Sequence, residues 1–282
     1  MKLSCIVLTS NSYAHKGGCV EHVLLALARQ RAVDRELIVV ENSGEGPSRD
    51  RLTRFLREAR LRDVRVVATC TSVAAGRNAG ARRATGDVLV FVDDDAIALD
   101  GHALSTVAEA AATASHGYGA QRLWTRPLGW FQRHARELRE DVAAGRFGRL
   151  RRHLGPPAPG LRQATQPKYL MRSFVGHFGF VRAREFTAAG GFPEDFTGYA
   201  LEDDALSFLL YHRRGGFANL GSTCVAHVSH PVPALLAEGH EQNRPLYTGI
   251  LNRHGVRSFH IGDLLEPASA PDRRVCEPLA AP

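Results

Sequence analysis

The sequence has no apolar run long enough to cross a bilayer, which takes about 20 residues. Residues 1–8 resemble the opening of a signal peptide, but polar residues follow at Thr9 and Asn11 without a small-residue cleavage site. We therefore interpret residues 1–8 as a first core strand. We predict a cytoplasmic protein without a transmembrane segment, and leave peripheral membrane contact open.

Cysteine is scarce and scattered. The five cysteines are odd in number and form no CxxC pair. This pattern argues against a disulfide framework and against a zinc ribbon, and reduced thiols fit a cytosolic setting.

Acidic residues are scarce in one segment. Between residues 126 and 168, ten basic side chains face three acids, an excess equal to the net charge of +7 of the whole chain. An arginine-rich helix facing solvent explains this excess, and so does a surface that binds an anionic partner. We predict no nucleic-acid partner.

The first hundred residues alternate between two periodicities. Apolar runs at residues 4–8, 36–40, 64–68 and 88–92 are typical of strands covered on both faces, and helical patterns lie between them. Such alternation predicts an α/β fold with a mostly parallel sheet, whose ligands bind beyond the carboxyl ends of the strands.

Later segments predict a basic helix over 133–154, a loop over 155–160 and a strand over 173–181. Helices are expected over 183–189 and 202–213, and the polar run 240–244 is interpreted as a helix surface.

Three adjacent acids, Asp93, Asp94 and Asp95, directly follow the apolar run 88–92. Neighbouring like charges repel, and a divalent ion such as Mg²⁺ or Mn²⁺ relieves the repulsion. If the strand continued through them, Asp93 and Asp95 would share one side and Asp94 the other. By itself this cluster is also typical of phosphatases, receiver domains and nucleotidyltransferases.

Four motifs in order resemble the donor half of family 2 glycosyltransferases. They are Thr9-Ser10-Asn11, Glu41-Asn42-Ser43-Gly44, Gly76-Arg77-Asn78-Ala79-Gly80 and Asp93-Asp94-Asp95. The resemblance implies the Rossmann-like GT-A fold, with a mostly parallel central sheet flanked by helices.

It also implies residue roles. Nucleotide-sugar binding falls to Thr9, Asn11, Glu41, Arg77, Asp93 and Asp94. In that family the last acid of the DxD motif, here Asp95, binds the metal, so the expected cofactor is Mn²⁺ or Mg²⁺. Glu41 stands where Asp is commoner, which leaves the nucleotide open, with a UDP-sugar favoured.

A second acidic run, Glu202-Asp203-Asp204, begins an expected helix. The helix dipole favours acids there, so capping explains part of this pattern. The preceding Gly-Gly-Phe turn and Tyr199 resemble the acceptor half of the same family. By that resemblance Asp203 is the catalytic base of an inverting transfer, and Glu202, Asp204 and Tyr199 contact the acceptor.

A histidine completes the metal site in that family. His227 is our first candidate and His230 the second, since on a straight strand the two would point to opposite faces.

These observations predict one GT-A domain over residues 1–262, with a donor half at about 1–100, a basic helical insertion at about 126–168 and an acceptor half at about 170–262. A loose tail follows over 263–282. The expected activity is metal-dependent inverting sugar transfer to an unidentified acceptor.

Two alternatives stay open. A sugar nucleotidyltransferase needs a glycine-rich, Lys- or Arg-bearing loop immediately after the first strand, where this chain reads Thr9-Ser10-Asn11-Ser12-Tyr13. In an inactive nucleotide-sugar- or glycan-binding protein, Asp203→Asn would change no measurable property.

Overall fold

A computed structural model describes residues 1–44, 46–61, 63–157, 173–213, 216–228, 230, 235–259 and 276–278. The strands are β1 (Lys2–Thr9), β2 (Asp34–Glu41), β3 (Val64–Ala68), β4 (Val88–Asp93), β5 (Ala96–Ala98), β6 (His116–Trp124), β7 (Leu154–Pro157), β8 (Phe178–Arg182), β9 (Phe217–His227), β10 (Val256–Phe259) and β11 (Cys276–Pro278). The helices are α1 (Ser12–His15), α2 (Cys19–Ala28), α3 (Pro47–Glu58), α4 (Val73–Ala81), α5 (Ala103–Thr113), α6 (Leu128–Ala143), α7 (Gly148–Arg151), α8 (Ala183–Ala189), α9 (Glu202–His212) and α10 (Leu235–Arg253).

One large sheet organises the molecule. Its strand order is β3-β2-β1-β4-β8-β6-β9-β5, and β7 pairs with β6. β3, β2, β1 and β4 are parallel to one another, whereas β8 is antiparallel to both β4 and β6. β6 and β9 therefore share the direction of β1, and β5, β7 and β8 run against it. The prediction of a mostly parallel sheet in an α/β fold is confirmed.

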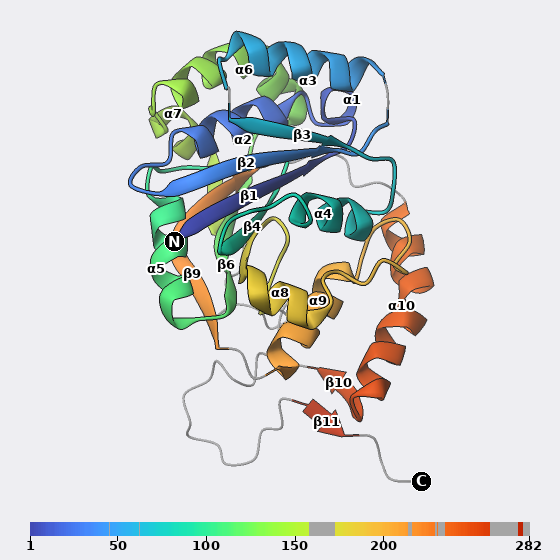
Figure 1. Ribbon diagram of the computed structural model, residues 1–282. Coiled ribbons are helices and arrows are strands. Elements are labelled where there is room, and N and C mark those ends of the chain that lie inside the picture. Colours follow the sequence, from blue (N-terminus) through green and yellow to red (C-terminus); the bar gives the residue numbers. More distant parts are fainter. Residues whose placement is uncertain are drawn as a thin grey trace.

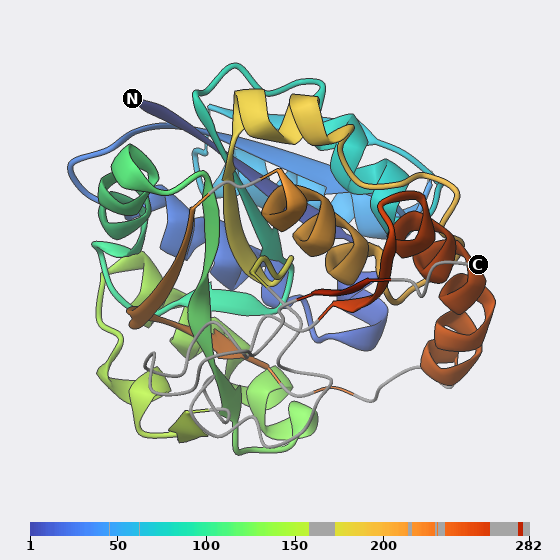
Figure 2. The same cartoon turned by 90° about the horizontal axis from the view of Figure 1, so that it is seen from below.

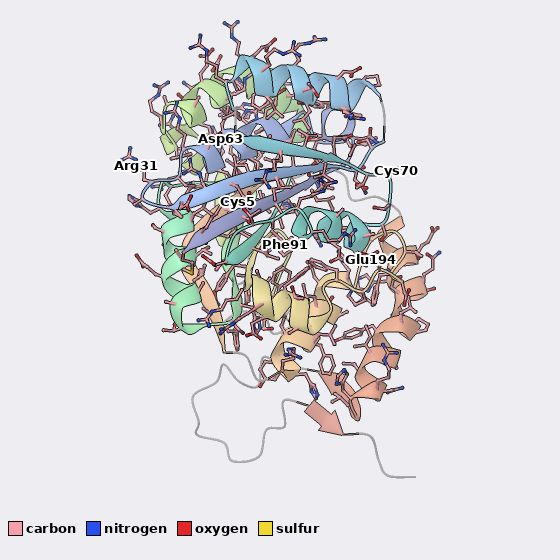
Figure 3. All side chains as sticks on the ribbon, in the orientation of Figure 1. Cys5, Arg31, Asp63, Cys70, Phe91 and Glu194 are labelled. Carbon is pink, nitrogen blue, oxygen red and sulfur yellow. The ribbon has the colours of Figure 1, made fainter. Side chains whose placement is uncertain are left out.

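Helices cover both faces of the parallel strands. α2, α3 and α6 lie on one face, and α4, α8 and α9 on the other (Figure 1). Along β1 the side chains alternate between the two cores, with Cys5 and Val7 on the α2 side and Ile6 on the α4 side. Phe91 of β4 and Glu194 lie on the α4 side (Figure 3). The continuous apolar runs are thus explained by burial on two faces.

The middle of the chain departs most from the prediction. β6, at the centre of the sheet, was not expected. The basic helix predicted over 133–154 is two helices, α6 and α7, separated at Gly145, whose φ is 72°. α6 packs on the α2 side through Phe131, Leu138 and Val142, which are all buried in the main core. Residues 155–157 belong to β7 rather than to the predicted loop, and residues 158–172 lie outside the described residues.

The predicted strand over 173–181 begins later, at Phe178 of β8, which leaves residues 173–177 as a connecting segment. α10 lies beside α9 at the edge of the molecule (Figures 1 and 2), and the two helices share a small core with β10. The predicted tail, 263–282, lies outside the described residues apart from β11, which pairs with β10. Within the described ranges, no helix combines the length and apolarity of a membrane span.

Candidate active site

Three parallel strands end side by side on residues of the predicted donor site. The register pairs Thr9 of β1 with Glu41 of β2, and Leu8 of β1 with Asp93 of β4. Thr9 and Glu41 are buried, whereas a quarter of the Asp93 side chain (25%) is exposed. This sheet edge is where ligands bind in open α/β sheets.

Arg77 of α4 joins this edge to the start of α9. Its guanidinium is buried; Nη2 donates to Asp93 Oδ1 at 2.9 Å. Nη1 donates to Asp203 Oδ1 at 2.9 Å and to Glu202 Oε1 at 3.1 Å. One side chain therefore holds carboxylates of both predicted halves, and its two terminal nitrogens are engaged by them.

α4 reaches these partners because it lies close to the sheet. A Cβ atom at Gly76 would stand 2.9 Å from Leu8 Cδ1, so a larger residue would push the helix away. Next to Arg77, Asn78 donates through Nδ2 to Phe192 O (2.8 Å) and accepts from Phe192 N (3.0 Å). The Gly-Arg-Asn sequence thus also fixes the Gly-Gly-Phe turn of the predicted acceptor half.

The three acids at the start of α9 differ in exposure. Glu202 and Asp204 are buried, whereas 14% of the Asp203 side chain is exposed. Asp203 Oδ2 accepts a hydrogen bond from Gly176 N at 2.8 Å, from the segment that precedes β8. Of the three, Asp203 is the acid that solvent reaches best.

A strained turn leads into α9. Ala200 and Leu201 have φ values of 103° and 68°, which non-glycine residues rarely adopt. Asn243 of α10 holds the turn, because its Nδ2 donates to Thr197 O and to Ala200 O at 2.9 Å each. Asn243 is buried, so the prediction of a helix surface over 240–244 is wrong at this residue. Tyr199 in the same turn is half exposed.

The other two acids of the first cluster turn away from Asp93. β4 ends at Asp93, so the alternation expected of a strand does not reach Asp94 and Asp95. Thr9 Oγ1 donates to Asp94 Oδ2 at 2.7 Å. Lys16 Nζ lies 2.7 Å from Asp94 Oδ1 and 2.9 Å from Asp95 Oδ2. Sequence reasoning missed Lys16, although it lies on the loop after the first strand.

Both candidate histidines lie close to the carboxylate of Asp95. The β5–β9 pairing sets His227 opposite Ala96, and His227 Nε2 is 3.4 Å from Asp95 Oδ1. His230 Nε2 is 2.8 Å from Asp95 Oδ2. β9 ends at His227, so strand alternation does not separate the two rings.

This group fits a divalent metal ion. Ligand atoms of Asp95, His227 and His230 all lie within 4.8 Å of one another. Asp95 Oδ1 is buried without a hydrogen-bond partner among the described residues, which leaves one carboxylate oxygen for an ion. Burial raises the pKa of Asp95, but the hydrogen bond from His230 and the charges of Lys16 and His227 outweigh burial and hold it below its usual range. The ligand set suits Mn²⁺ among other transition ions.

Among the described residues, one oxygen of the Glu41 carboxylate has a hydrogen-bond partner and the other has none. Ser43 Oγ donates to Glu41 Oε1 and accepts from Asn11 N at 2.6 Å. Asn11 itself is exposed, in a left-handed conformation with a φ of 50°. Glu41 Oε2 is buried without a partner among the described residues, and a buried acceptor of this kind is costly unless a ligand satisfies it.

A family model described as glycosyl transferase family 2 matches residues 4–182, which include Thr9, Arg77 and Asp95. The chain belongs to glycosyl transferase family 2. Asp203 and His227 lie beyond the matched residues. Two validoxylamine A glucosyltransferases, from Streptomyces hygroscopicus subsp. jinggangensis (strain 5008) and subsp. limoneus, are each 26% identical to it over 74% of this chain. The chain spans about half the length of these curated relatives, 51% and 48%.

Solved structures share the fold of this family 2 member. S. aureus TarS 1–349 in complex with UDP-GlcNAc has a TM-score of 0.60 at 16% identity, covering 89% of this chain and 66% of that one. Mannosyltransferase PcManGT from Pyrobaculum calidifontis, in complex with GDP-Man and Mn²⁺, has a TM-score of 0.57 at 18% identity, covering 91% and 65%. GalNAc-T7 with UDP, GalNAc and Mn²⁺ has a TM-score of 0.57 at 14% identity, covering 86% and 48%. The predicted GT-A fold is confirmed.

Proposed function

We propose that this family 2 member is a metal-dependent inverting glycosyltransferase, which moves a sugar from a nucleoside-diphosphate sugar to an acceptor hydroxyl. The observation that carries this proposal is the buried Arg77, which pairs with Asp93 and with Asp203. Burying charged groups is costly. A buried cation that joins the two predicted halves in spite of this cost supports chemistry at their junction.

The nucleoside would lie over the ends of β1 and β2, near Thr9, Asn11 and Glu41. The unpartnered Glu41 Oε2 supports this, because an N–H group of a base would satisfy it. Asp93 would meet the ribose. A UDP-sugar is favoured, since TarS was solved with UDP-GlcNAc. PcManGT was solved with GDP-Man, so a guanosine nucleotide is tested as well.

Asp95, His227 and His230 would hold the metal ion. When bound, an ion there supplies positive charge for the departing nucleoside diphosphate. Two imidazoles favour Mn²⁺ over Mg²⁺ because Mg²⁺ prefers oxygen ligands. The Mn²⁺ complexes of PcManGT and GalNAc-T7 agree with this choice.

Asp203 would be the base. The acceptor oxygen attacks the anomeric carbon, the bond from that carbon to the diphosphate oxygen breaks, and the hydroxyl proton passes to Asp203. Each Asp203 oxygen accepts one hydrogen bond in the structure and has a further lone pair. A single displacement of this kind inverts the anomeric configuration.

Tyr199, being half exposed, would stack on a sugar ring, whereas Glu202 and Asp204 are buried and would support the turn. Arg77 is engaged by three carboxylates, and Asp94 by Thr9 and Lys16. Both would therefore hold other residues of the donor site in position. The acceptor is unidentified; the basic segment favours an anionic one.

The first test is a thermal-shift screen of UDP, GDP, dTDP and CMP, each with Mn²⁺ or with EDTA. We expect stabilisation that needs one nucleotide and the ion together, because a ligand that binds the native state raises its melting temperature. If no nucleotide with Mn²⁺ raises the melting temperature, the donor site is refuted.

The second test separates catalysis from binding. Asp203→Asn should lose donor hydrolysis and transfer yet keep the nucleotide–Mn²⁺ shift. Asp195→Asn, on an exposed residue of the segment that precedes α9, is the matched control and should stay active. Unchanged turnover in Asp203→Asn would exclude Asp203 as the base, whereas no turnover in wild type either would leave an inactive binding protein. Proton NMR of the product anomer reports the inversion.

One observation favours the nucleotidyltransferase alternative. A lysine and two glycines, Lys16-Gly17-Gly18, do follow β1, although later than the five residues immediately after it. Incubation with UTP and a sugar 1-phosphate tests it, and we expect no release of pyrophosphate.

A further inference from the structure

Lysine is rare in this chain: it supplies three of the 36 basic residues, at positions 2, 16 and 168. Of the two lysines that the structure describes, Lys16 is the one that meets the first acidic cluster, where its ammonium contacts Asp94 and Asp95. An ammonium is a compact point charge with three N–H donors, unlike the planar fork of arginine. The choice of residue is therefore informative.

The loop after β1 directs Lys16 into the cluster. α1 ends at His15, and Gly17 and Gly18 then take left-handed conformations, with φ values of 64° and 76°, that lead into α2. Gly18 N donates to Ser12 O at 3.0 Å, and Cys19 N to Lys16 O at 3.3 Å. These bonds fix the backbone at Lys16, and the carboxylates of Asp94 and Asp95 hold its ammonium.

The contacts of Lys16 leave one oxygen of Asp95 and one N–H group of the ammonium without a hydrogen-bond partner among the described residues. Its ammonium meets Asp94 Oδ1 and Asp95 Oδ2, so Asp95 Oδ1, which faces His227, stays available to an ion. Two of its three N–H groups point at these carboxylates, and among the described residues no acceptor takes the third. The side chain is 23% exposed, so a ligand can reach it.

We propose that Lys16 is a second cation of the donor site, which neutralises Asp94 and Asp95 Oδ2 and donates its third N–H to a phosphate oxygen of the donor. This inference rests on the proposed function. With Lys16, the two carboxylates and a divalent ion carry a net positive charge. Without it they carry none, and a diphosphate is held less tightly.

The test measures metal and nucleotide binding separately. Mn²⁺ binding without nucleotide is followed by the EPR signal of the free ion, and UDP binding at saturating Mn²⁺ by calorimetry, with GDP in its place if GDP is the nucleotide that stabilises wild type. Lys16→Met should raise the Kd of the nucleotide at least about tenfold without weakening Mn²⁺ binding. Lys16→Arg, which keeps the charge, should recover part of the affinity.

Lys2→Met is the matched control. Lys2 lies at the opposite end of β1 and contacts Glu36 and Thr85, so its loss should change neither affinity. Lys16→Gln serves as a second neutral variant in case the methionine variant does not fold.

Two results overturn the role of Lys16. One is a neutral variant that binds the nucleotide as tightly as wild type. The other is an equal loss of Mn²⁺ and nucleotide affinity, which marks a merely structural residue. If wild type binds no nucleoside diphosphate with any ion, the proposed function fails, and this inference with it.

Discussion

Arg77→Met is the most informative single substitution in this protein. It keeps a side chain of similar length and removes the guanidinium that pairs with Asp93, Glu202 and Asp203. The three carboxylates then lie together without their shared cation. Asp93 belongs to the predicted donor half, and Glu202 and Asp203 belong to the predicted acceptor half. We therefore expect both stability and function to depend on Arg77.

The magnitude follows from burial. The Arg77 and Glu202 side chains are 4% and 6% exposed, and breaking such a buried pair by removing one partner costs about 3–5 kcal/mol. Asp93 is more exposed and adds less, since solvent screens it. For a domain of this size each kcal/mol shifts the melting temperature by roughly 2–4 °C, so we expect a fall of roughly 6–20 °C.

Thermal unfolding followed by circular dichroism measures this. Arg82→Met, at the C-cap of the same helix, is the matched control, because the Arg82–Glu194 pair is exposed (63% and 48%) and should contribute less than about 1 kcal/mol. Combining Arg77→Met with Glu202→Gln should cost less than the sum of the single changes, since residues in contact couple by about 0.5–3 kcal/mol. If Arg77→Met melts like Arg82→Met, the Arg77 network does not stabilise the protein. If the two changes simply add, Arg77 and Glu202 do not couple.

Three further predictions concern the turn that Asn243 holds, the metal site and the stability in acid. Asn243→Ala should lower turnover more than nucleotide affinity, because Asn243 holds the strained turn before Asp203 and forms no hydrogen bond with the described residues of the predicted donor site. Steady-state kinetics measures the turnover and calorimetry the affinity. An affinity that falls as far as the turnover would contradict this prediction. His227→Ala and His230→Ala should each raise at least about tenfold the Mn²⁺ concentration needed for half of the thermal shift, and an unchanged titration in both variants would exclude this metal site. Burial raises the pKa of Glu36, but hydrogen bonds from Ser4 and Thr85 and the charge of Lys2 outweigh it and lower the pKa to about 2 from 4.5. A depressed folded pKa contributes stability above pH 4.5 that is lost as the pH falls towards 2; Glu36→Gln should therefore be less stable than wild type at pH 7, with the difference shrinking across that window in acid titrations.

Local patterns predicted the parallel strands of the sheet well. The runs that became β1, β2, β3 and β4 are apolar on both faces because helices cover both sides of the sheet, and such runs are visible without any tertiary information. The acids after β4 were recognisable because an apolar strand seldom ends on three carboxylates. The central strand β6 escaped prediction, since its glycines and polar residues carry no apolar periodicity, and its place depends on pairing with β8 and β9.

The candidate site shows the same division. The motifs and their order along the chain were enough to pick out the candidate residues, which are Asp93 to Asp95, Arg77, the acids of α9 and the two histidines. They did not show the partners of these residues: whether Arg77 faces a nucleotide or three carboxylates, whether His230 joins His227, and whether Asn243 is a surface residue depend on where strands end and which elements pack together. Lys16 had no motif to mark it, and only the turn at Gly17 and Gly18 brings it to the acids. Chain-local chemistry determined which groups this protein has; contacts between residues some 15 to 130 positions apart decided which of them act on one another.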